Sequence, residues 1–257
     1  MSTVLDPLAS FRLDDRVAIV TGASSGLGDR FARVLHAAGA RVVLAARRKD
    51  RLDAIAAELP GSMVVAADLA VSADRERLVG ATLDGFGTVD ILVNNAGLGR
   101  MTAIEDEELD WFRQVMELNV TACWHLAKLV GAVMVPKQRG SIVNVASMLG
   151  LVGSTPIKQA HYAASKGALV NMTRELGLQW ARKGVRVNAL CPGWFPSEMT
   201  AGMETDPSAQ TFIKANSPMP RMGEEAELDG PLLLLASDAG SFMTGHTLVV
   251  DGGWTAR

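Results

Sequence analysis

With 257 residues, 48% of them hydrophobic and 21% charged, the chain is long enough for one large α/β domain or two small ones with an ordinary buried core. The formal net charge of −3 excludes a strongly basic protein, so we expect no nucleic-acid partner and no attraction to an anionic membrane. The two cysteines, Cys123 and Cys191, show neither metal-type nor Cys-x-x-Cys spacing, which argues against a disulfide framework. The first residues lack the pattern of a secretory signal, and no apolar run reaches membrane-spanning length. We therefore expect a cytoplasmic protein without a bound metal.

Short runs that are almost entirely apolar recur along the chain. The first covers residues 17–20 and ends at the sequence TGASSGLG, after which helical periodicity extends to about residue 38. Later runs of the same kind cover residues 41–45, 63–67, 91–93, 142–145, 185–190 and 248–250. Strands of a parallel sheet are covered by helices on both faces, so their sequences are continuously apolar rather than alternating. These runs therefore predict about seven buried, parallel strands.

Helical segments separate the predicted strands, most clearly over residues 49–59, 107–133 and 162–182. Strand–helix alternation predicts right-handed βαβ units in a doubly wound sheet with helices on both faces. Because no repeat or linker divides the chain, we predict a single domain over residues 1–257 with an N-terminal tail over 1–14. The segment 194–222 is rich in Pro, Met, Ser and Gly and interrupts the alternation. A connection of this length is typical of a lid over a substrate, and a surface insertion is the alternative.

A glycine-rich turn, residues 21–28, lies between the first predicted strand and the first predicted helix. Glycines there permit a tight turn and close approach of the backbone to a ligand, and the helix N-terminus offers free N–H groups to a pyrophosphate. The strand before it and the helix after it favour a dinucleotide site over a turn without a ligand.

The second predicted strand ends in Ala45-Ala46-Arg47-Arg48, where dinucleotide folds usually carry an acidic residue that binds the adenosine ribose. Guanidinium groups bind a 2′-phosphate, which a carboxylate would repel. Arg47 and Arg48 therefore predict a preference for NADP(H), with NAD(H) still possible. The alternative is that Arg47, Arg48, Lys49 and Arg51 only cover a solvated helix start, with Asp50 and Asp53 as partners.

Tyr162, the only tyrosine of the chain, precedes Lys166 by four residues, so both side chains lie on one face of the predicted helix. A free phenol ionises at a pH of ~10 and is a poor base at neutral pH. A nearby ammonium, together with the positive charge of an oxidised nicotinamide, favours the phenolate. Ser147 follows an apolar strand at the carboxyl edge of the sheet, where ligands of open α/β folds bind. These three residues predict acid–base chemistry at that edge.

Taken together, these motifs resemble those of the short-chain dehydrogenase/reductase family, in its compact single-domain branch with a Rossmann-type sheet. The resemblance extends from residue 17 to residue 253. The matching pieces are TGASSGLG (21–28), Asp68-Leu69, Asn94-Asn95-Ala96-Gly97, Asn119, Ser147, Tyr162-x-x-x-Lys166, Pro192-Gly193 and Asp251-Gly252-Gly253.

The resemblance implies a role for each matching side chain. Tyr162 would exchange a proton with the substrate oxygen, which Ser147 would bind and stabilise. Lys166 would hold the nicotinamide ribose and favour the phenolate of Tyr162, and Asn119 would anchor a water molecule of a proton relay. For Asn119 and Ser147 the alternatives are a helix-interior amide and a strand-end cap. The expected cofactor-binding residues are Gly22, Ser24, Ser25, Gly26, Leu27, Gly28, Arg47, Arg48, Asp68, Leu69, Asn95, Ala96, Gly97, Tyr162, Lys166, Pro192, Gly193, Phe195 and Ser197.

The substrate pocket is less well defined by the resemblance, because the connection 148–161 is somewhat longer than is usual in the family. We expect it to contain Ser147, Leu149, His161, Tyr162, Trp194 and Met199. Further apolar candidates are Met101, Met148, Leu151, Val152, Phe195, Met203 and Phe212. His161 is interpreted as a rim or packing residue rather than a base. Apolar walls suit a small or medium carbonyl compound or secondary alcohol.

The sequence thus predicts an NADP(H)-dependent oxidoreductase with Tyr162 as general acid/base. An NAD-preferring alcohol or polyol dehydrogenase and a catalytically silent dinucleotide sensor are the alternatives. By resemblance, the helices carrying Asn119 and Tyr162 form the main interface of a homotetramer. The segment Asp251-Gly252-Gly253-Trp254 resembles the second contact of such an assembly, in which a neighbouring subunit would bury Trp254.

Overall fold

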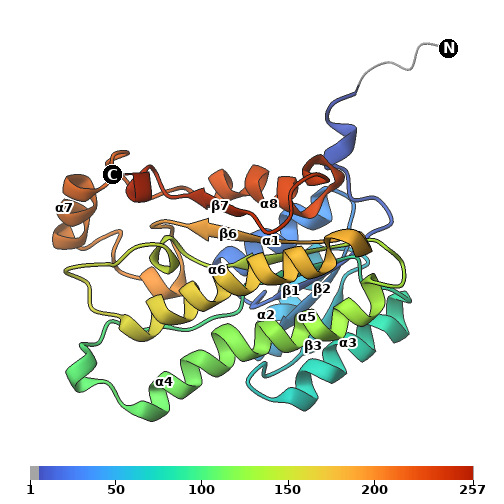
Figure 1. The fold of residues 1–257 in the computed structure, drawn as a ribbon, viewed down its shortest axis with the longest axis horizontal. Helices are drawn as coiled ribbons and strands as arrows, with labels where there is room; N and C mark the ends of the chain where they lie inside the picture. Colours follow the sequence, from blue (N-terminus) through green and yellow to red (C-terminus); the bar gives the residue numbers. More distant parts are fainter. Residues whose placement is uncertain (1–5, 257) are drawn as a thin grey trace.

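The computed structural model describes residues 6–256, so residues 1–5 of the expected N-terminal tail lie outside it (Figure 1). Within the described residues, seven strands form one sheet in the order β3-β2-β1-β4-β5-β6-β7, and every neighbouring pair is parallel. The strands are β1 (Val17–Thr21), β2 (Arg41–Ala46), β3 (Met63–Ala66), β4 (Ile91–Asn94), β5 (Gly140–Val145), β6 (Val185–Pro192) and β7 (Thr247–Val250). All seven predicted strands are confirmed, as is the doubly wound, Rossmann-type sheet.

Helices connect the strands on both faces of the sheet. They are α1 (Gly26–Ala37), α2 (Lys49–Glu58), α3 (Ser72–Phe86), α4 (Leu109–Met116), α5 (Ala122–Met134), α6 (Ala160–Trp180), α7 (Pro207–Asn216) and α8 (Asp229–Ala236). The helix predicted over residues 107–133 is confirmed with one difference. A π-helical turn, Glu117–Thr121, joins α4 to α5.

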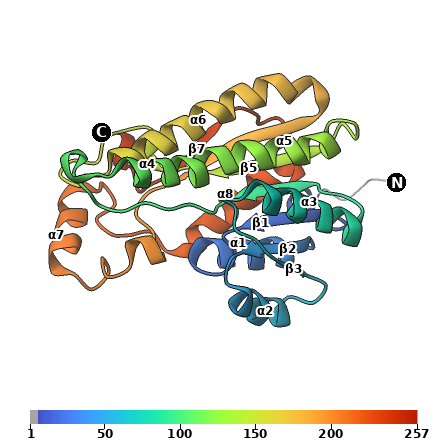
Figure 2. The same cartoon turned by 90° about the horizontal axis from the view of Figure 1, so that it is seen from below.

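The side chains of each strand divide between two cores, one on each face of the sheet. In β1, Ala18 and Val20 pack with α1, α2 and α8, whereas Val17 and Ile19 pack with α3, α5 and α6. All four side chains are fully buried. Figure 2 shows α5 and α6 on one side of the sheet and α1 and α2 on the other. Burial on both faces explains why the strand sequences are apolar at every position.

The direction of winding reverses between β1 and β4, which are neighbours in the sheet although β2 and β3 separate them in sequence. In open α/β sheets, ligands bind in the crevice outside the carboxyl ends of the strands at this point. The turns after β1, β4, β5 and β6 all open there, so the topology gathers the motifs of the sequence at one edge.

The N-terminal tail and the segment 194–222 differ in detail from what the sequence predicts. Leu13, within the expected N-terminal tail, is 1% exposed and belongs to the core. The segment 194–222 contains a short 3₁₀ helix, Glu198–Thr200, and the helix α7, rather than an unstructured insertion. Across residues 6–256, no helix combines the length and the apolarity needed to cross a membrane.

Candidate active site

A cleft with a volume of about 770 Å³ opens at the carboxyl edge of the sheet. The expected cofactor-binding residues all line it: Gly22, Ser24, Ser25, Gly26, Leu27, Gly28, Arg47, Arg48, Asp68, Leu69, Asn95, Ala96, Gly97, Tyr162, Lys166, Pro192, Gly193, Phe195 and Ser197. Ser147 and Met199 line it as well. In the described part of the chain, no three His, Cys, Asp or Glu side chains are grouped so that they could hold a metal ion.

The glycine-rich turn forms a cradle with no room for side chains. Gly22 and Gly26 have φ values of +67° and +51°, which residues other than glycine rarely adopt. A Cβ atom on Gly28 would lie 2.1 Å from the backbone oxygen of Gly22. α1 begins at Gly26 within this turn, so the free N–H groups of its first turn belong to the wall of the cleft. This cradle fits the pyrophosphate of a dinucleotide.

Hydrogen bonds between the ends of β1 and β4 hold the floor of the cleft in place. Thr21 Oγ1 donates to the backbone oxygen of Val93 and accepts from the backbone N–H groups of Asn95 and Ala96. The side-chain amide of Asn95 donates to the backbone oxygen of Thr21. The switch point is therefore cross-linked by side chains as well as by the sheet.

Tyr162, Lys166 and Ser147 all line the cleft. Lys166 Nζ lies 5.6 Å from the centre of the Tyr162 ring and donates to the backbone oxygen of Val145 over 2.8 Å. Ser147 Oγ accepts from the backbone N–H of Leu149 and is 8% exposed. A Cβ on Gly99 would lie 2.6 Å from Tyr162 Cδ2, so the backbone of residue 99 packs directly against the phenol ring.

Asn119 lies behind the cleft, on the π-helical turn, and is fully buried. Its Oδ1 accepts from the backbone N–H of Leu98, and its Nδ2 donates to the backbone oxygen of Leu98 and to Ser165 Oγ. Ser165 Oγ in turn donates to the backbone oxygen of Tyr162. The amide of Asn119 thus joins the segment after β4 to the helix that carries the tyrosine. π-helical turns are rare and often occur at functional sites.

Arg48 connects three parts of the cleft wall. It donates to Ser24 Oγ and Ser25 Oγ of the glycine-rich turn and, through two nitrogens, to both carboxylate oxygens of Glu198. Arg51 also donates to Glu198. Hydrogen bonding to Arg48 lowers the pKa of Glu198 to about 2. The structure thus pairs Arg48 and Arg51 with a carboxylate 150 and 147 residues away along the chain.

Lys49 pairs with Asp53, as the alternative interpretation expects for this cation. Arg47 is exposed and lines the cleft.

Part of the expected substrate pocket is an apolar cluster beside Tyr162. Met148 and Leu149 are buried, at 1% and 5% exposure. They pack with Trp194, Phe212 and Trp254. Phe195 is also buried, at 5% exposure, whereas the remaining apolar candidates are more open: Met101 is 71% exposed, Leu151 37% and Val152 36%, and Met203 is half-buried.

The expectation that a neighbouring subunit buries Trp254 is wrong. Trp254 is 6% exposed within this one chain. Its ring centre lies 5.8 Å from that of Trp194 and 5.7 Å from that of Phe212. The segment 194–222 folds back over the C-terminal residues, and these contacts across the chain are not visible in the local sequence.

His161 does not lie at the rim of the pocket, although it adjoins Tyr162 in sequence. It is 1% exposed, and its Nδ1 lies 2.5 Å from Glu107 Oε1. The backbone N–H of Arg100 donates to its Nε2. Burial lowers the pKa of His161, although Glu107 opposes this shift. Of the two roles expected for His161, rim residue and packing residue, its burial agrees with packing. Successive residues of a helix point in different directions, so His161 and Tyr162 face different surroundings.

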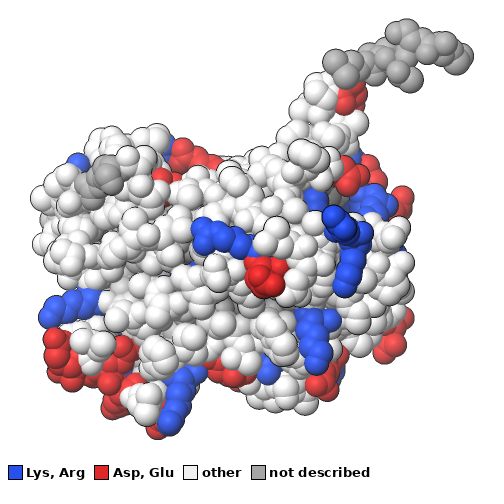
Figure 3. All heavy atoms as spheres, in the orientation of Figure 1, with Lys and Arg blue, Asp and Glu red and all other residues white. Residues whose placement is uncertain are grey.

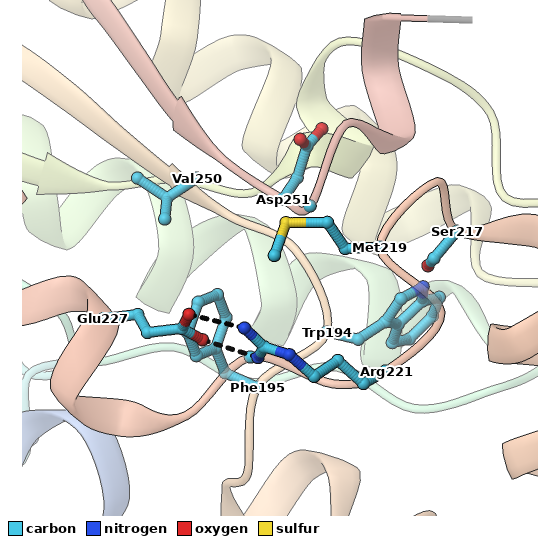
Figure 4. A pocket seen from close by; sticks show the side chains of 10 residues that line it. Trp194, Phe195, Ser217, Met219, Arg221, Glu227, Val250 and Asp251 are labelled. Atoms are coloured by element: carbon cyan, nitrogen blue, oxygen red, sulfur yellow. Dashed lines mark hydrogen bonds and ion pairs between the residues drawn. The ribbon is translucent and has the colours of Figure 1, made fainter.

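A second, smaller cavity of about 90 Å³ lies at the base of the segment 194–222 (Figure 4). Trp194 lines this cavity and not the large cleft, whereas Phe195 lines both. Figure 4 shows Arg221 and Glu227 joined at its side by two ion-pair contacts. The cavity therefore lies where the two ends of the segment 194–222 pack against the end of β7 and the residues that follow it.

Sequence reasoning missed Glu198, Glu107 and Gly99. All three act through partners that are distant along the chain, and nothing local distinguishes them from ordinary surface or loop residues. Glu198 is not distinguished by its charge either, since the segment 194–222 also contains Glu204, Asp206, Lys214 and Arg221.

Comparisons with known proteins agree with this site. A family model described as enoyl-(acyl carrier protein) reductase matches residues 22–255. A galactitol 2-dehydrogenase (L-tagatose-forming) of Cereibacter sphaeroides is 41% identical over 254 residues, covering 98% of this chain and 99% of that protein. A 3-oxoacyl-(acyl-carrier-protein) reductase of Synechocystis sp. is 36% identical, covering 94% of this chain and 97% of that protein.

A solved structure of a related dehydrogenase has the same fold over its whole length. A gluconate 5-dehydrogenase from Burkholderia cenocepacia J2315, in complex with NADP and tartrate, superposes with a TM-score of 0.93 at 32% identity. The match covers 98% of this chain and 100% of that one. Fold, cleft and relatives together define an NAD(P)-dependent oxidoreductase. The chain belongs to the short-chain dehydrogenase/reductase family, as the resemblance of its motifs predicted.

Proposed function

We propose that this enzyme interconverts a secondary alcohol and the corresponding carbonyl compound with NADP(H), with Tyr162 as general acid/base. The observation that carries the proposal is that Tyr162, Lys166 and Ser147 line the same cleft as the glycine-rich turn. When bound, the nicotinamide supplies or accepts the hydride. All other steps of the reaction are assigned to side chains of this chain.

The proton steps fall to Tyr162 and its neighbours. In reduction, Tyr162 Oη donates a proton to the carbonyl oxygen of the substrate, and in oxidation it takes the proton back. Ser147 Oγ donates a hydrogen bond to the same oxygen and stabilises charge that develops there. The positive charge of Lys166 favours the phenolate form of Tyr162, and its ammonium group would hold the nicotinamide ribose.

For the proton relay, we assign the binding of a water molecule to the backbone oxygen of Asn119 rather than to its side chain. Its amide is already bonded to Leu98 and Ser165, so a water molecule would be held by the backbone oxygen instead. The amide would keep the segment after β4 at a fixed distance from α6.

For the substrate, the apolar side chains of Leu118, Phe195 and Met199, which line the cleft together with Tyr162, support a small or medium molecule with an apolar side. The 41% identity to a galactitol 2-dehydrogenase supports adding polyols to the candidates. We also propose that the segment 194–222 acts as a lid, because it contributes Phe195, Ser197 and Met199 to the cleft.

The preference for NADP(H) rests on Arg47 and Arg48, which line the cleft beside the glycine-rich turn. The binding of NADP to the related gluconate 5-dehydrogenase agrees with this assignment. Equal or greater catalytic efficiency with NADH than with NADPH would contradict it.

A homotetramer is proposed from the exposed apolar residues of the helices next to the site. Leu109 of α4, Trp124 of α5 and Leu178 of α6 are 60%, 49% and 75% exposed. Figure 3, drawn in the orientation of Figure 1, shows Lys, Arg, Asp and Glu scattered over this face with broad uncharged areas between them. A mass of one chain in sedimentation equilibrium would contradict the assembly. Both cysteines are free and buried, which supports a reducing, cytoplasmic location.

The test of the reaction is a panel of ketones, aldehydes, secondary alcohols and polyols assayed with both cofactors, in the parent enzyme and in Tyr162→Phe. The phenylalanine keeps the ring that packs against Gly99 and removes only the hydroxyl. We expect kcat to fall by about 10²–10⁴. Unchanged turnover in Tyr162→Phe would refute the role of Tyr162.

A further inference from the structure

The carboxylate of Glu198, in the proposed lid, forms ion pairs with Arg48 and Arg51. Arg48 also donates hydrogen bonds to the glycine-rich turn. Glu198 opens the short helix Glu198–Thr200, whose start is capped by Ser197 Oγ. Its two oxygens accept from Arg48 over 2.7 and 3.0 Å, and one of them also accepts from Arg51 over 2.8 Å. Arg48 and Arg51 lie at the start of α2, so these contacts bridge two walls of the cleft.

The geometry of this contact is the one that a phosphate would use. Two guanidinium nitrogens binding two oxygens form the forked pair that arginine makes with carboxylates and phosphates alike. The remaining hydrogen bonds of Arg48 go to Ser24 and Ser25, where the glycine-rich turn begins. Arg48 is therefore positioned toward the cofactor cradle while its charge is already neutralised.

An incoming 2′-phosphate and Glu198 cannot share the arginines at low cost. A phosphate monoester carries about −1.5 to −2 charges at neutral pH, and like charges at hydrogen-bonding distance repel. The Glu198 carboxylate stays ionised across the physiological range, since its pKa is about 2. The side chains of Arg48 and Glu198 are 38% and 56% exposed, so the pair is accessible and can exchange partners.

We propose that Glu198 is a determinant of cofactor specificity that competes with the 2′-phosphate of NADP(H) for Arg48 and Arg51. With NAD(H), which has no such phosphate, the carboxylate stays on the arginines and the lid remains attached to α2. With NADP(H), the phosphate takes its place. The selectivity for NADP(H) is therefore lower than two arginines alone would give. The inference rests on the dinucleotide site of the proposed function, but not on which cofactor the parent enzyme prefers.

The experiment measures dissociation constants by calorimetry for NADPH and NADH, and for their fragments adenosine 2′,5′-bisphosphate and AMP. The variants are Glu198→Gln and Glu198→Ala. The matched control is Glu227→Gln, which removes a carboxylate that is also paired with an arginine, Arg221, and also has a pKa of about 2. Glu227 lines the small cavity of Figure 4 and not the cofactor cleft.

We expect both Glu198 variants to bind NADPH and the bisphosphate about fivefold more tightly, as the loss of two competing exposed ion pairs allows. Binding of NADH and AMP should change by less than about twofold, and Glu227→Gln should behave as the parent does. An unchanged ratio of the two affinities in both Glu198 variants would overturn the inference. So would an equal shift in Glu227→Gln. Failure of the parent to bind either dinucleotide would contradict the proposed function itself, and the inference with it.

Discussion

Lys166 Nζ donates a hydrogen bond of 2.8 Å to the backbone oxygen of Val145, the last residue of β5. Ser147 follows two residues later, so this bond ties the helix that carries Tyr162 to the strand end that carries the serine. Lys166 is 4% exposed, and a buried ammonium needs such a partner. The same bond therefore supports both the fold and the arrangement of the three proposed catalytic groups.

The first prediction concerns this bond. Lys166→Met leaves the oxygen of Val145 without its donor, and we expect the free energy of unfolding to fall by about 1–3 kcal/mol. Loss of the charge should also lower kcat and weaken cofactor binding. Denaturant unfolding and steady-state kinetics measure the two effects. Lys183→Met, at an exposed position, is the control and should change neither property appreciably. A variant with normal turnover would show that the ammonium has no part in the reaction.

The second prediction compares two glycines. Gly28→Ala places a Cβ 2.1 Å from a backbone oxygen that cannot move aside, so the turn must shift. We expect a loss of stability of about 2–3 kcal/mol and a loss of cofactor binding. Gly80→Ala, in α3 with nothing within 4 Å of the new Cβ, should instead stabilise the protein by about 0.5–1 kcal/mol. Thermal unfolding and cofactor titration of both variants test this prediction. Equal stability and equal cofactor binding in the two variants would contradict the role of Gly28 in the glycine-rich turn.

A third prediction separates the two arginines after β2. Arg48 makes hydrogen bonds to the glycine-rich turn, whereas Arg47 is exposed. These bonds hold the Arg48 guanidinium beside the cofactor cradle, where it can bind a 2′-phosphate, so Arg48→Ala should lower catalytic efficiency with NADPH by about tenfold or more. Arg47→Ala should have a smaller effect, and efficiency with NADH should change little in either variant. Kinetics with both cofactors test this, and a larger loss in Arg47→Ala would reverse the assignment.

The fourth prediction concerns the thiols. Burial raises the pKa of both Cys123 and Cys191 to about 11. Only the thiolate is nucleophilic, so iodoacetamide at pH 8 should modify the native protein far more slowly than the unfolded chain. Mass spectrometry over time measures this. Rapid modification of the native protein would show that the cysteines are accessible.

The same thiols add a pH dependence to stability. In the unfolded chain a thiol ionises with a pKa near ~8.5, so the folded state retains its protons to higher pH. The contribution of each thiol is complete below that value and is lost as pH rises toward 11. Cys123→Ala should lose less stability than the parent over this interval, which denaturant unfolding at pH 7 and pH 10 measures.

Much of the fold follows from the sequence because each strand is a short apolar run and each turn has its own chemistry. Seven such runs, separated by helical periodicity, allow few arrangements other than a doubly wound parallel sheet. The glycine-rich turn could be assigned for the same reason. Its glycines have backbone conformations and close contacts that no other residue permits, so they are visible locally.

The residues that the sequence did not reveal act across the fold. Glu198 reaches Arg48 from 150 residues away. Glu107 meets His161 in the interior, and Trp254 is buried by Trp194 and Phe212 rather than by a second subunit. Local spacing contains no information on which side chains meet in this way.

By itself, the sequence determined the order of the elements, the glycine-rich turn and the spacing of Tyr162 and Lys166, since hydrophobic periodicity and backbone freedom are properties of neighbouring residues. Only the tertiary structure decided which charges pair across the cleft and which aromatic rings are covered. Those outcomes depend on distances between segments that the chain brings together only when it folds.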